Sequence, residues 1–466
     1  MKQRRKLFIA AGATLAISAT LIGLPASAAP QVINNGSIFT TTTGAELQAH
    51  GGGIIKVGSF YYFMGENRKD DGHFNAVSMY RSSDLKNWEF RNDILRSTTA
   101  AELNVSNVER PKVIFNSSTG EYVLWAHWEN GADYSQARVL VATSNTVDGN
   151  YTYHGSFRPL GFDSRDMTVF KDADGSAYLI SASNVNFDLH IYLLNSSYTG
   201  IASLVHNIAG YHREAPAVFK RGSTYFMVTS GATGWTPNQA AYLTATNMAG
   251  PWSAPVNFGN GNTYNSQSTF VLPIQGTAGT SYLYLGDRWG PAQDQRVNQS
   301  QYVWLPLTFP SATSLAMNGR SQITIDAAAG TTSLGASATT LYKIRSATSG
   351  YCVNVANELL AYTRSVMQYD CANVLNEQVE PRAAGSNIQF VFQQSGLCLA
   401  QNDTAASGGP VVQHGCTQPK AQWFWSGTRL VNRLTGACLM SPNNTRTALV
   451  TATCDGGADQ NWSLLP

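Results

Sequence analysis

Five short apolar stretches between residues 50 and 290 are each preceded by polar residues that could do chemistry. These residues are His50, Glu109–Arg110, Arg165–Asp166, Arg213–Glu214 and Gln267. Carboxylates exchange protons, arginines stabilise anions, and an amide can orient a bound molecule through hydrogen bonds. Brought together, such a set would form a reaction site, whereas a single acid before a strand would indicate little.

The stretches themselves have the pattern of β-hairpins, because each joins a short apolar run to a Tyr-rich run through a turn. They occupy residues 51–63, 111–125, 167–180, 217–228 and 269–285. The repeat of about 50 residues predicts a β-propeller with one blade per unit, which would gather the polar residues at one end of its axis. A two-sheet sandwich is the structural alternative. Pairs such as Glu109–Arg110 could also serve only to tie blades together.

Cysteine divides the chain into two parts. All six Cys lie between Cys352 and Cys454, which predicts a separate C-terminal unit. Within it the spacing Cys–Cys–Gln recurs in three repeats of about 40 residues each, which predicts a compact three-lobed β unit. Zinc ligation is a weak alternative, because no two Cys stand close enough in sequence. Residues 326–340 are small and polar and are predicted to be a flexible linker.

The N-terminus has the pattern of a secretory signal over residues 1–28, with basic residues, an apolar run and a small-residue cleavage site. An uncleaved membrane anchor is the alternative. Removal of the signal, which carries four basic residues, changes the formal charge from +2 to −2. We therefore expect a secreted, extracellular protein that binds neither nucleic acid nor membrane, since the chain has no further basic stripe or long apolar segment. No long helical period follows residue 28, so the predicted fold is all-β.

Residues 30–325 resemble glycoside hydrolase family 43, whose members are five-bladed propellers that hydrolyse glycosides with inversion. The resemblance includes the stretch from Tyr80 to Trp88. It implies a catalytic domain over residues 29–325, with Glu214 as the general acid and Asp166 as the carboxylate that tunes the pKa of that acid.

The first blade departs from the family, because His50-Gly51-Gly52-Gly53 stands where His-Asp-Pro is usual. The exo-β-1,3-galactanases of the family also lack this Asp. The sequence resembles them there and in the stretches Gly65–Arg68, Thr233–Trp235 and Ser266–Ser268. For the water that attacks the sugar, the candidates are Glu109 and Gln267. We favour a shared arrangement in which Gln267 positions the water and Glu109 holds the sugar or takes its proton.

Further residues are expected to contact the substrate. They are Glu66, Trp125, Thr233, Trp235, Asn238, Asp287 and Trp289. The run Asp172-Ala-Asp174-Gly resembles the start of a calcium loop, but a hairpin turn is the better interpretation because no Glu completes it. The His residues show no metal-ligand pattern, so neither a metal nor a cofactor is predicted.

Residues 341–466 resemble the ricin-type β-trefoil sugar-binding module. The six Cys are expected to form disulfides in an exported protein, namely Cys352, Cys371, Cys398, Cys416, Cys438 and Cys454. The resemblance assigns sugar contacts to Asn354 with Tyr369 in the first lobe, and to His414, less securely, in the second. The third lobe is expected to be structural.

The resulting hypothesis is a monomeric exo-acting galactan 1,3-β-galactosidase that binds β-1,3-galactan or arabinogalactan. An arabinofuranosidase or xylosidase is one alternative, although the missing first-blade Asp argues against it. A lectin that binds glycan without cleaving it is the other. Retention of Glu214, Asp166 and Glu109 together argues against the lectin.

Overall fold

The computed structural model describes residues 29–466 apart from 294, 321, 335–340, 357–362, 373, 375 and 406–407. The predicted signal over residues 1–28 lies outside this range. The described chain is almost entirely β-structure, which confirms the all-β prediction, and one short α-helix is found in it, α1 (Ala101–Asn104). None of the helices described there has the length and apolarity to traverse a bilayer.

Five four-stranded antiparallel sheets follow one another, each made of consecutive strands. Their first strands are β2 (His50–Val57), β6 (Asn107–Asn116), β10 (Met167–Lys171), β14 (Arg213–Arg221) and β18 (Gln267–Gly276). The second strands are β3 (Phe60–Arg68), β7 (Glu121–Glu129), β11 (Ala177–Ser183), β15 (Thr224–Gly231) and β19 (Gly279–Arg288). The third are β4 (Phe74–Ser82), β8 (Arg138–Ser144), β12 (Asp188–Leu194), β16 (Ala241–Ala245) and β20 (Gln301–Thr308). The fourth are β5 (Glu89–Arg96), β9 (Thr152–Phe157), β13 (Ile201–Ile208), β17 (Val256–Asn257) and β21 (Ala316–Met317).

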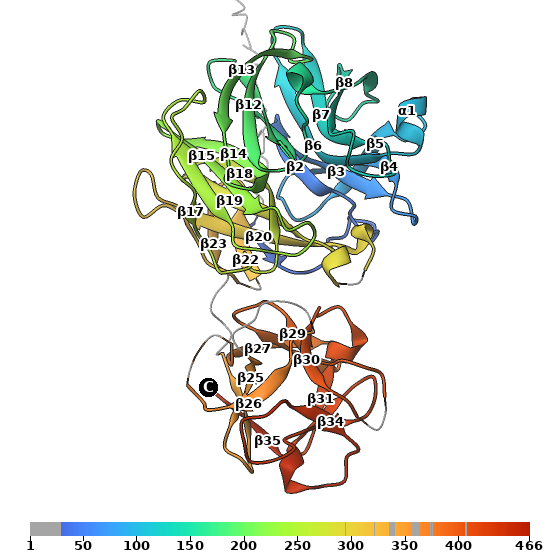
Figure 1. Cartoon of the computed structure of the whole chain (residues 1–466), viewed down its shortest axis with the longest axis vertical. Coiled ribbons are helices and arrows are strands. Elements are labelled where there is room, and N and C mark those ends of the chain that lie inside the picture. The colour runs from blue at the N-terminus through green and yellow to red at the C-terminus, as the bar shows by residue number, and fades with distance from the viewer. Residues whose placement is uncertain are drawn as a thin grey trace, which may run out of the picture.

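The sheets are arranged in a ring. β2 contacts β6, β6 contacts β10, β10 contacts β14, β14 contacts β18, and β18 returns to β2. Apolar side chains from neighbouring sheets fill the space between them, as where Met64 and Val77 pack with Leu124 and Leu140. This closed series of first strands is the arrangement of a β-propeller (Figure 1).

Four of the five first strands share an irregularity at the end where the polar residues lie. The pairing register shifts after His50 in β2, after Glu109 in β6, after Glu214 in β14 and after Ser268 in β18. In three of these strands the next residue has a positive φ, namely Gly51 (62°), Arg110 (56°) and Ala215 (52°). Such β-bulges redirect side chains out of the regular alternation.

A separate small sheet joins the beginning of the described chain to the end of the ring. β1 (Gln31–Asn34) pairs with β22 (Gln322–Asp326), which pairs with β23 (Thr331–Leu334). Part of the predicted linker 326–340 is therefore a β-hairpin, and this corrects the prediction. Small polar and β-branched residues can pair at a sheet edge, which composition alone does not reveal. Residues 335–340 lie outside the described part.

The C-terminal part forms a second all-β unit, drawn in orange and red in Figure 1. Its core contains Phe390, Trp423 and Trp462, and the disulfides Cys352–Cys371, Cys398–Cys416 and Cys438–Cys454 confirm the predicted use of all six Cys. The unit contacts the ring, because Asn260 Nδ2 donates to the Gln394 carbonyl at 2.5 Å. Its strands are β24 (Lys343–Ser346), β25 (Cys352–Val355), β26 (Val366–Tyr369), β27 (Val379–Ala384), β28 (Asn387–Phe392), β29 (Cys398–Gln401), β30 (Val411–His414), β31 (Trp423–Ser426), β32 (Arg429–Asn432), β33 (Cys438–Met440), β34 (Val450–Ala452) and β35 (Trp462–Leu465).

Candidate active site

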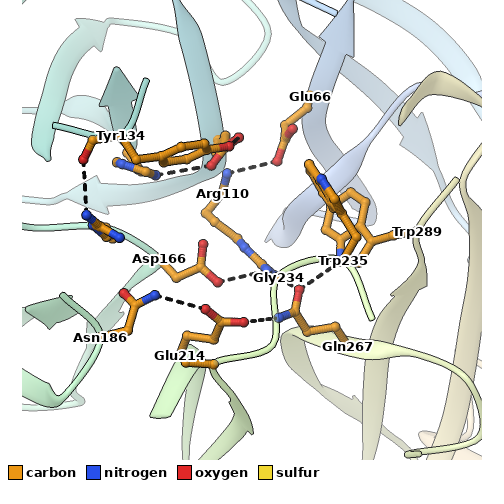
Figure 2. A pocket seen from close by; sticks show the side chains of 14 residues that line it. Glu66, Arg110, Tyr134, Asp166, Asn186, Glu214, Gly234, Trp235, Gln267 and Trp289 are labelled. Atoms are coloured by element: carbon orange, nitrogen blue, oxygen red, sulfur yellow. Dashed lines mark hydrogen bonds and ion pairs between the residues drawn. The ribbon is translucent and has the colours of Figure 1, made fainter. Parts of the chain in front are cut away.

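A pocket of about 240 Å³ opens at the end of the ring where the first strands begin. It is both charged and aromatic, and its side chains come from all five sheets and the loops between them (Figure 2). The lining residues are Glu66, Glu109, Arg110, His127, Tyr134, Arg165, Asp166, Asn186, Glu214, Ala232, Gly234, Trp235, Gln267 and Trp289. The structure thus brings together Glu214, Asp166, Glu109 and Gln267, as the sequence pattern predicts.

Glu214 is buried at the start of β14 and has defined partners on both carboxyl oxygens. Oε1 accepts a hydrogen bond from Gln267 Nε2 at 2.9 Å, and Oε2 accepts one from Asn186 Nδ2 at 3.1 Å. Burial, together with the nearby negative charge of Asp166, raises the pKa of Glu214 to about 8. This carboxyl group is therefore protonated at neutral pH, as a general acid must be.

Asp166 is fixed beside this acid, directly before β10. Its Oδ2 lies 2.9 Å from Arg110 Nη2 and accepts the Ala215 backbone N–H at 3.1 Å. The second bond ties Asp166 to the bulge that carries Glu214. The arrangement lets the charge of Asp166 act on the acid at a constant separation.

Gln267 has all of its hydrogen-bonding groups occupied. Oε1 accepts from Arg110 Nη2 at 2.5 Å and from Trp289 Nε1 at 2.7 Å. Nε2 donates to Glu214 Oε1 and to Ser230 Oγ, each at 2.9 Å. Because Arg and Trp side chains can only donate, these contacts fix the orientation of the amide. A water at Gln267 would have to replace one of these partners.

Glu109 is held as an anion. Its Oε1 accepts from Arg68 Nη2 and from the Tyr134 hydroxyl, both at 2.7 Å, and its Oε2 lies 3.2 Å from His127 Nδ1. The other imidazole nitrogen of His127 lies 2.9 Å from Glu129 Oε1. Burial alone would raise the pKa of Glu109, but the contact with His127 and the charge of Arg68 hold the pKa well below its ordinary value.

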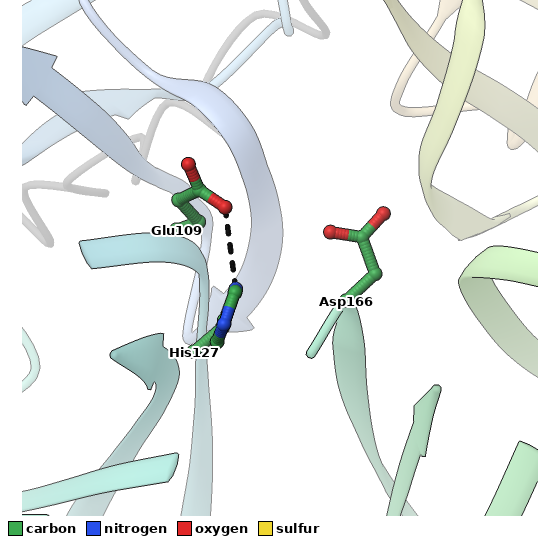
Figure 3. A group of neighbouring side chains, drawn as sticks. All are labelled: Glu109, His127 and Asp166. Atoms are coloured by element: carbon green, nitrogen blue, oxygen red, sulfur yellow. Dashed lines mark ion pairs between the residues drawn. The ribbon is translucent and has the colours of Figure 1, made fainter. Parts of the chain in front are cut away.

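Glu109, His127 and Asp166 are close enough to suggest a cation site, since their ligand atoms lie within 4.8 Å of one another (Figure 3). A metal would need a neutral imidazole. Burial lowers the pKa of His127, but Glu109 and Glu129 outweigh it and raise the pKa to about 9. With Arg110 paired to Asp166, the positive charge comes from the protein itself. In the structure these groups are charge-paired within the protein, Asp166 with Arg110 and Glu109 with His127.

Glu66 fills the place next to Gly51, where the resembled family carries its Asp. Glu66 Oε1 accepts the Arg110 backbone N–H at 3.2 Å, and Oε2 accepts from Arg68 Nη2 at 2.8 Å. A Cβ atom added to Gly51 would lie only 2.3 Å from Glu66 Oε1. The glycine is therefore required for this carboxylate to reach the pocket, where burial raises its pKa.

The pocket contains two of the three Trp residues proposed as sugar contacts. The rings of Trp235 and Trp289 lie 5.1 Å apart and are tilted by 68°. The Arg110 guanidinium lies 5.4 Å from the Trp289 ring. The two Trp rings form an aromatic wall opposite Tyr134 and Asp166 in Figure 2.

Trp125 is not a pocket residue, and this corrects the prediction. It is fully buried between the second and third sheets, and its Nε1 donates to the Tyr198 carbonyl at 2.8 Å. On β7 it pairs opposite Lys112, whereas His127, two residues nearer the pocket, pairs opposite Glu109. The position of a residue along β7 therefore decides whether its side chain lies in the core, as for Trp125, or in the pocket, as for His127.

Asn238, Asp287 and the Thr233 side chain are also outside the pocket, again contrary to prediction. Asn238 Nδ2 donates to Thr233 Oγ1 at 2.6 Å, and Asn238 closes the loop before it through the Gly231 N–H and carbonyl, each at 2.7 Å. The Thr233 backbone N–H instead contributes a hydrogen bond to Glu214. Asp287 accepts the Gly51 N–H at 2.6 Å. These polar groups shape the backbone around the site.

Several residues of the site were not predicted from the sequence as site residues. His127 lines the pocket and faces Glu109 in the hairpin register, so pairing the strands would have indicated it. Arg68 lies behind the lining and bonds to Glu66 and Glu109. Tyr134 and Asn186 lie on loops, and no sequence pattern marks them.

In the C-terminal unit, Tyr369 is 39% exposed and Asn354 is buried, with its Oδ1 accepting from Asn376 Nδ2 at 2.8 Å. The Arg446 guanidinium lies 4.6 Å from the Tyr369 ring. His414 is only 3% exposed. A buried ring cannot offer a face to a sugar, so the assignment of His414 is corrected.

Comparison with known families agrees with this geometry. Residues 50–259 match the family described as glycosyl hydrolases family 43, and residues 340–462 match the ricin-type beta-trefoil lectin domain. No curated protein matches the chain.

Two solved structures resemble both parts of the chain. The exo-beta-1,3-galactanase 1,3Gal43A from Clostridium thermocellum is 41% identical, over 93% of this chain and 99% of that one, with a TM-score of 0.66. The exo-beta-1,3-galactanase from Phanerochaete chrysosporium, solved with beta-1,3-galactotriose, is 29% identical over 93% of each chain, with a TM-score of 0.65. The chain belongs to glycoside hydrolase family 43. It is a glycosidase with a β-propeller and an attached ricin-type β-trefoil lectin domain.

Proposed function

We propose that this protein is an exo-acting galactan 1,3-β-galactosidase that releases galactose from β-1,3-galactan chains with inversion. The observation that carries the proposal is Glu214, a buried acid with a pKa raised to about 8, placed beside Asp166 in the pocket. The similarity to two exo-beta-1,3-galactanases supports the choice of galactan.

In this mechanism Glu214 protonates the oxygen of the scissile bond while a water attacks the opposite face of the sugar. Asp166 keeps that proton in place, since its charge disfavours ionisation of Glu214. Arg110 bridges the two sides of the pocket, because it contacts both Asp166 and Gln267.

For the attacking water, the proposal keeps Gln267 as the positioning group, and Glu109 holds the sugar or accepts the proton that the water loses as its oxygen bonds to the sugar carbon. Glu109 is ionised and can accept that proton, which balances the proton that Glu214 gives to the departing oxygen. Gln267 Nε2 would hold the water in place of Ser230 Oγ, its uncharged partner.

The five sheets are proposed to be the five blades of a catalytic domain over residues 29–325. The signal over residues 1–28 would direct secretion and be removed, and the mature protein would act as a monomer. The trefoil over residues 341–466 would bind the polysaccharide at the exposed Tyr369, while the buried Asn354 would support that lobe through its bond to Asn376.

The test is to incubate wild type, Glu214→Gln and Glu46→Gln with linear β-1,3-galactan and to follow free galactose and its first anomer. Glu46 is exposed and serves as the control. Loss of the acid should reduce release by about two or more orders of magnitude, while the control should match wild type. Release only from arabinofuranosides or xylosides would contradict the substrate. Binding of galactan without release by any variant would indicate a lectin.

A further inference from the structure

Exposed apolar side chains are concentrated beside the pocket. Leu160, Phe162, Val185, Phe187 and Tyr211 are 44–61% exposed, and we call these five residues the apolar rim. They lie on the loops that connect β9 to β10, β11 to β12 and β13 to β14. Contiguous apolar surface on a secreted protein commonly marks a binding surface.

The three loops of the apolar rim are bound to one another. The Asp163 carboxylate accepts hydrogen bonds from the backbone N–H groups of Asn184 at 2.8 Å and Val185 at 3.0 Å. The Phe187 carbonyl accepts the Gly210 N–H at 3.0 Å. These bonds tie the first loop to the second and the second to the third, so the rim is one surface.

The backbone of the second loop is held in a costly conformation. Asn184, Val185 and Asn186 have φ values of 50°, 53° and 65°, a left-handed run that a β-branched residue such as Val rarely adopts. The hydrogen bonds to Asp163 maintain this conformation, and it directs Val185 into solvent. Strain of this kind persists where the surrounding structure fixes it and is concentrated at functional sites.

The same loop touches the proposed acid. Asn186 Nδ2 donates to Glu214 Oε2 at 3.1 Å, and Figure 2 shows the two side chains adjacent. Asn186 Oδ1 is buried and makes no hydrogen bond to any residue in the described part of the chain. A general acid protonates the oxygen that joins the released sugar to the departing chain. The departing chain therefore passes beside Glu214, and Asn186 places the second loop of the apolar rim next to that carboxyl group.

We propose that the apolar rim binds the departing part of the galactan chain, beyond the sugar that is released. This inference rests on the proposed function and extends its site outward from the pocket. One face of a galactose unit is apolar and packs on aromatic and aliphatic side chains, as Phe187 and Tyr211 provide. Asn186 Oδ1 would accept a hydroxyl hydrogen of the first departing sugar.

The experiment compares wild type with Phe187→Ala and Tyr211→Ala on β-1,3-galactobiose, galactotriose and galactotetraose. Loss of a stacking surface should raise KM for the tetraose about tenfold, with kcat unchanged, and the effect should shrink as the chain shortens. Phe90→Ala is the matched control, because Phe90 is 48% exposed on β5, outside the rim and pocket. It should match wild type at every length. Melting temperatures confirm that all variants are folded.

Equal kinetics for all variants would show that the apolar rim does not bind the departing chain, while leaving the proposed function intact. A loss of the same size at every chain length would show the same, because the substitutions would then be acting on the pocket. Failure of wild type to release galactose would count against the proposed function instead. Calorimetric measurement of galactotetraose binding to the same variants would then test whether the apolar rim binds the chain, with weaker binding expected for Phe187→Ala and Tyr211→Ala. A dimer that Phe187→Ala dissociates, with unchanged oligosaccharide binding, would assign the surface to self-association.

Discussion

At the scale of single residues, the acid and the groups around it determine the pH dependence. Glu214 must be protonated to act, so activity should fall as the pH rises through about 8. Asp166→Asn removes a negative charge that favours the protonated form and leaves the positive charge of Arg110 uncompensated. Both changes lower the pKa of Glu214, so the alkaline limb of kcat/KM should move to lower pH. The measurement is a pH profile of kcat/KM for wild type and variant.

An unmoved alkaline limb in Asp166→Asn would contradict the proposal that Asp166 sets the pKa of Glu214. A limb moved to higher pH would contradict the prediction that this pKa falls. Asp174→Asn is a suitable comparison, since Asp174 is an exposed carboxylate on the turn between β10 and β11 and does not line the pocket. Its alkaline limb should stay where wild type has it.

Residue types predicted much of the site but not the depth of each side chain. Glu214, Asp166, Glu109 and Gln267 were found because equivalent hairpins place equivalent positions together. Trp125 was wrong because an aromatic residue on an inner hairpin can serve the core or the pocket, and only the register separates these uses. Tyr134 and Asn186 depend on loop conformations that no short-range pattern encodes.

At the scale of elements, the β-bulges explain how regular hairpins direct side chains into the pocket. The backbone turns left-handed directly after His50, Glu109 and Glu214, so the following residue does not continue the alternation of the strand. Gly51 is the sharpest case, because Glu66 occupies the space that a side chain there would need.

Gly51→Ala should therefore displace Glu66 and reduce kcat/KM about tenfold to a hundredfold, since small displacements at a reacting centre have effects of that size. Gly58→Ala is the matched control. Its φ of +58° carries a similar backbone cost, and a Cβ there would meet nothing within 4 Å. The backbone conformation should cost each variant about 1 kcal/mol of stability. Gly51→Ala should lose more, because Glu66 is displaced from its bonds to Arg68 and Arg110, and only Gly51→Ala should lose activity. Equal activity in the two would show that the position of Glu66 does not matter.

At the scale of the whole molecule, the two units are stabilised differently. Each has its own apolar core, and all three disulfides lie in the trefoil. Composition predicted this division, because the first 351 residues contain no Cys. It did not predict β23, because pairing with β22 involves residues that look like a linker.

Reduction of the disulfides should lower the unfolding temperature of the trefoil and leave that of the propeller unchanged. Losing a native disulfide of this kind costs about 2–5 kcal/mol. Scanning calorimetry with and without reductant would show one transition moving and one fixed, and galactose release from a short oligosaccharide should persist. Two transitions that move together would mean that the units unfold as one.

The small sheet that joins β1 to β22 has a consequence for how the protein is made. Gln31 pairs with Ile325, so β1 can complete its pairing only after β22, near the end of the catalytic domain, has been synthesised. The ring itself closes through contacts of β18 with β2, so until the fifth sheet is made the first sheet has an uncovered flank. Contacts so distant in sequence are slow to form. Completion of the propeller is therefore a late event that depends on nearly the whole domain having left the ribosome.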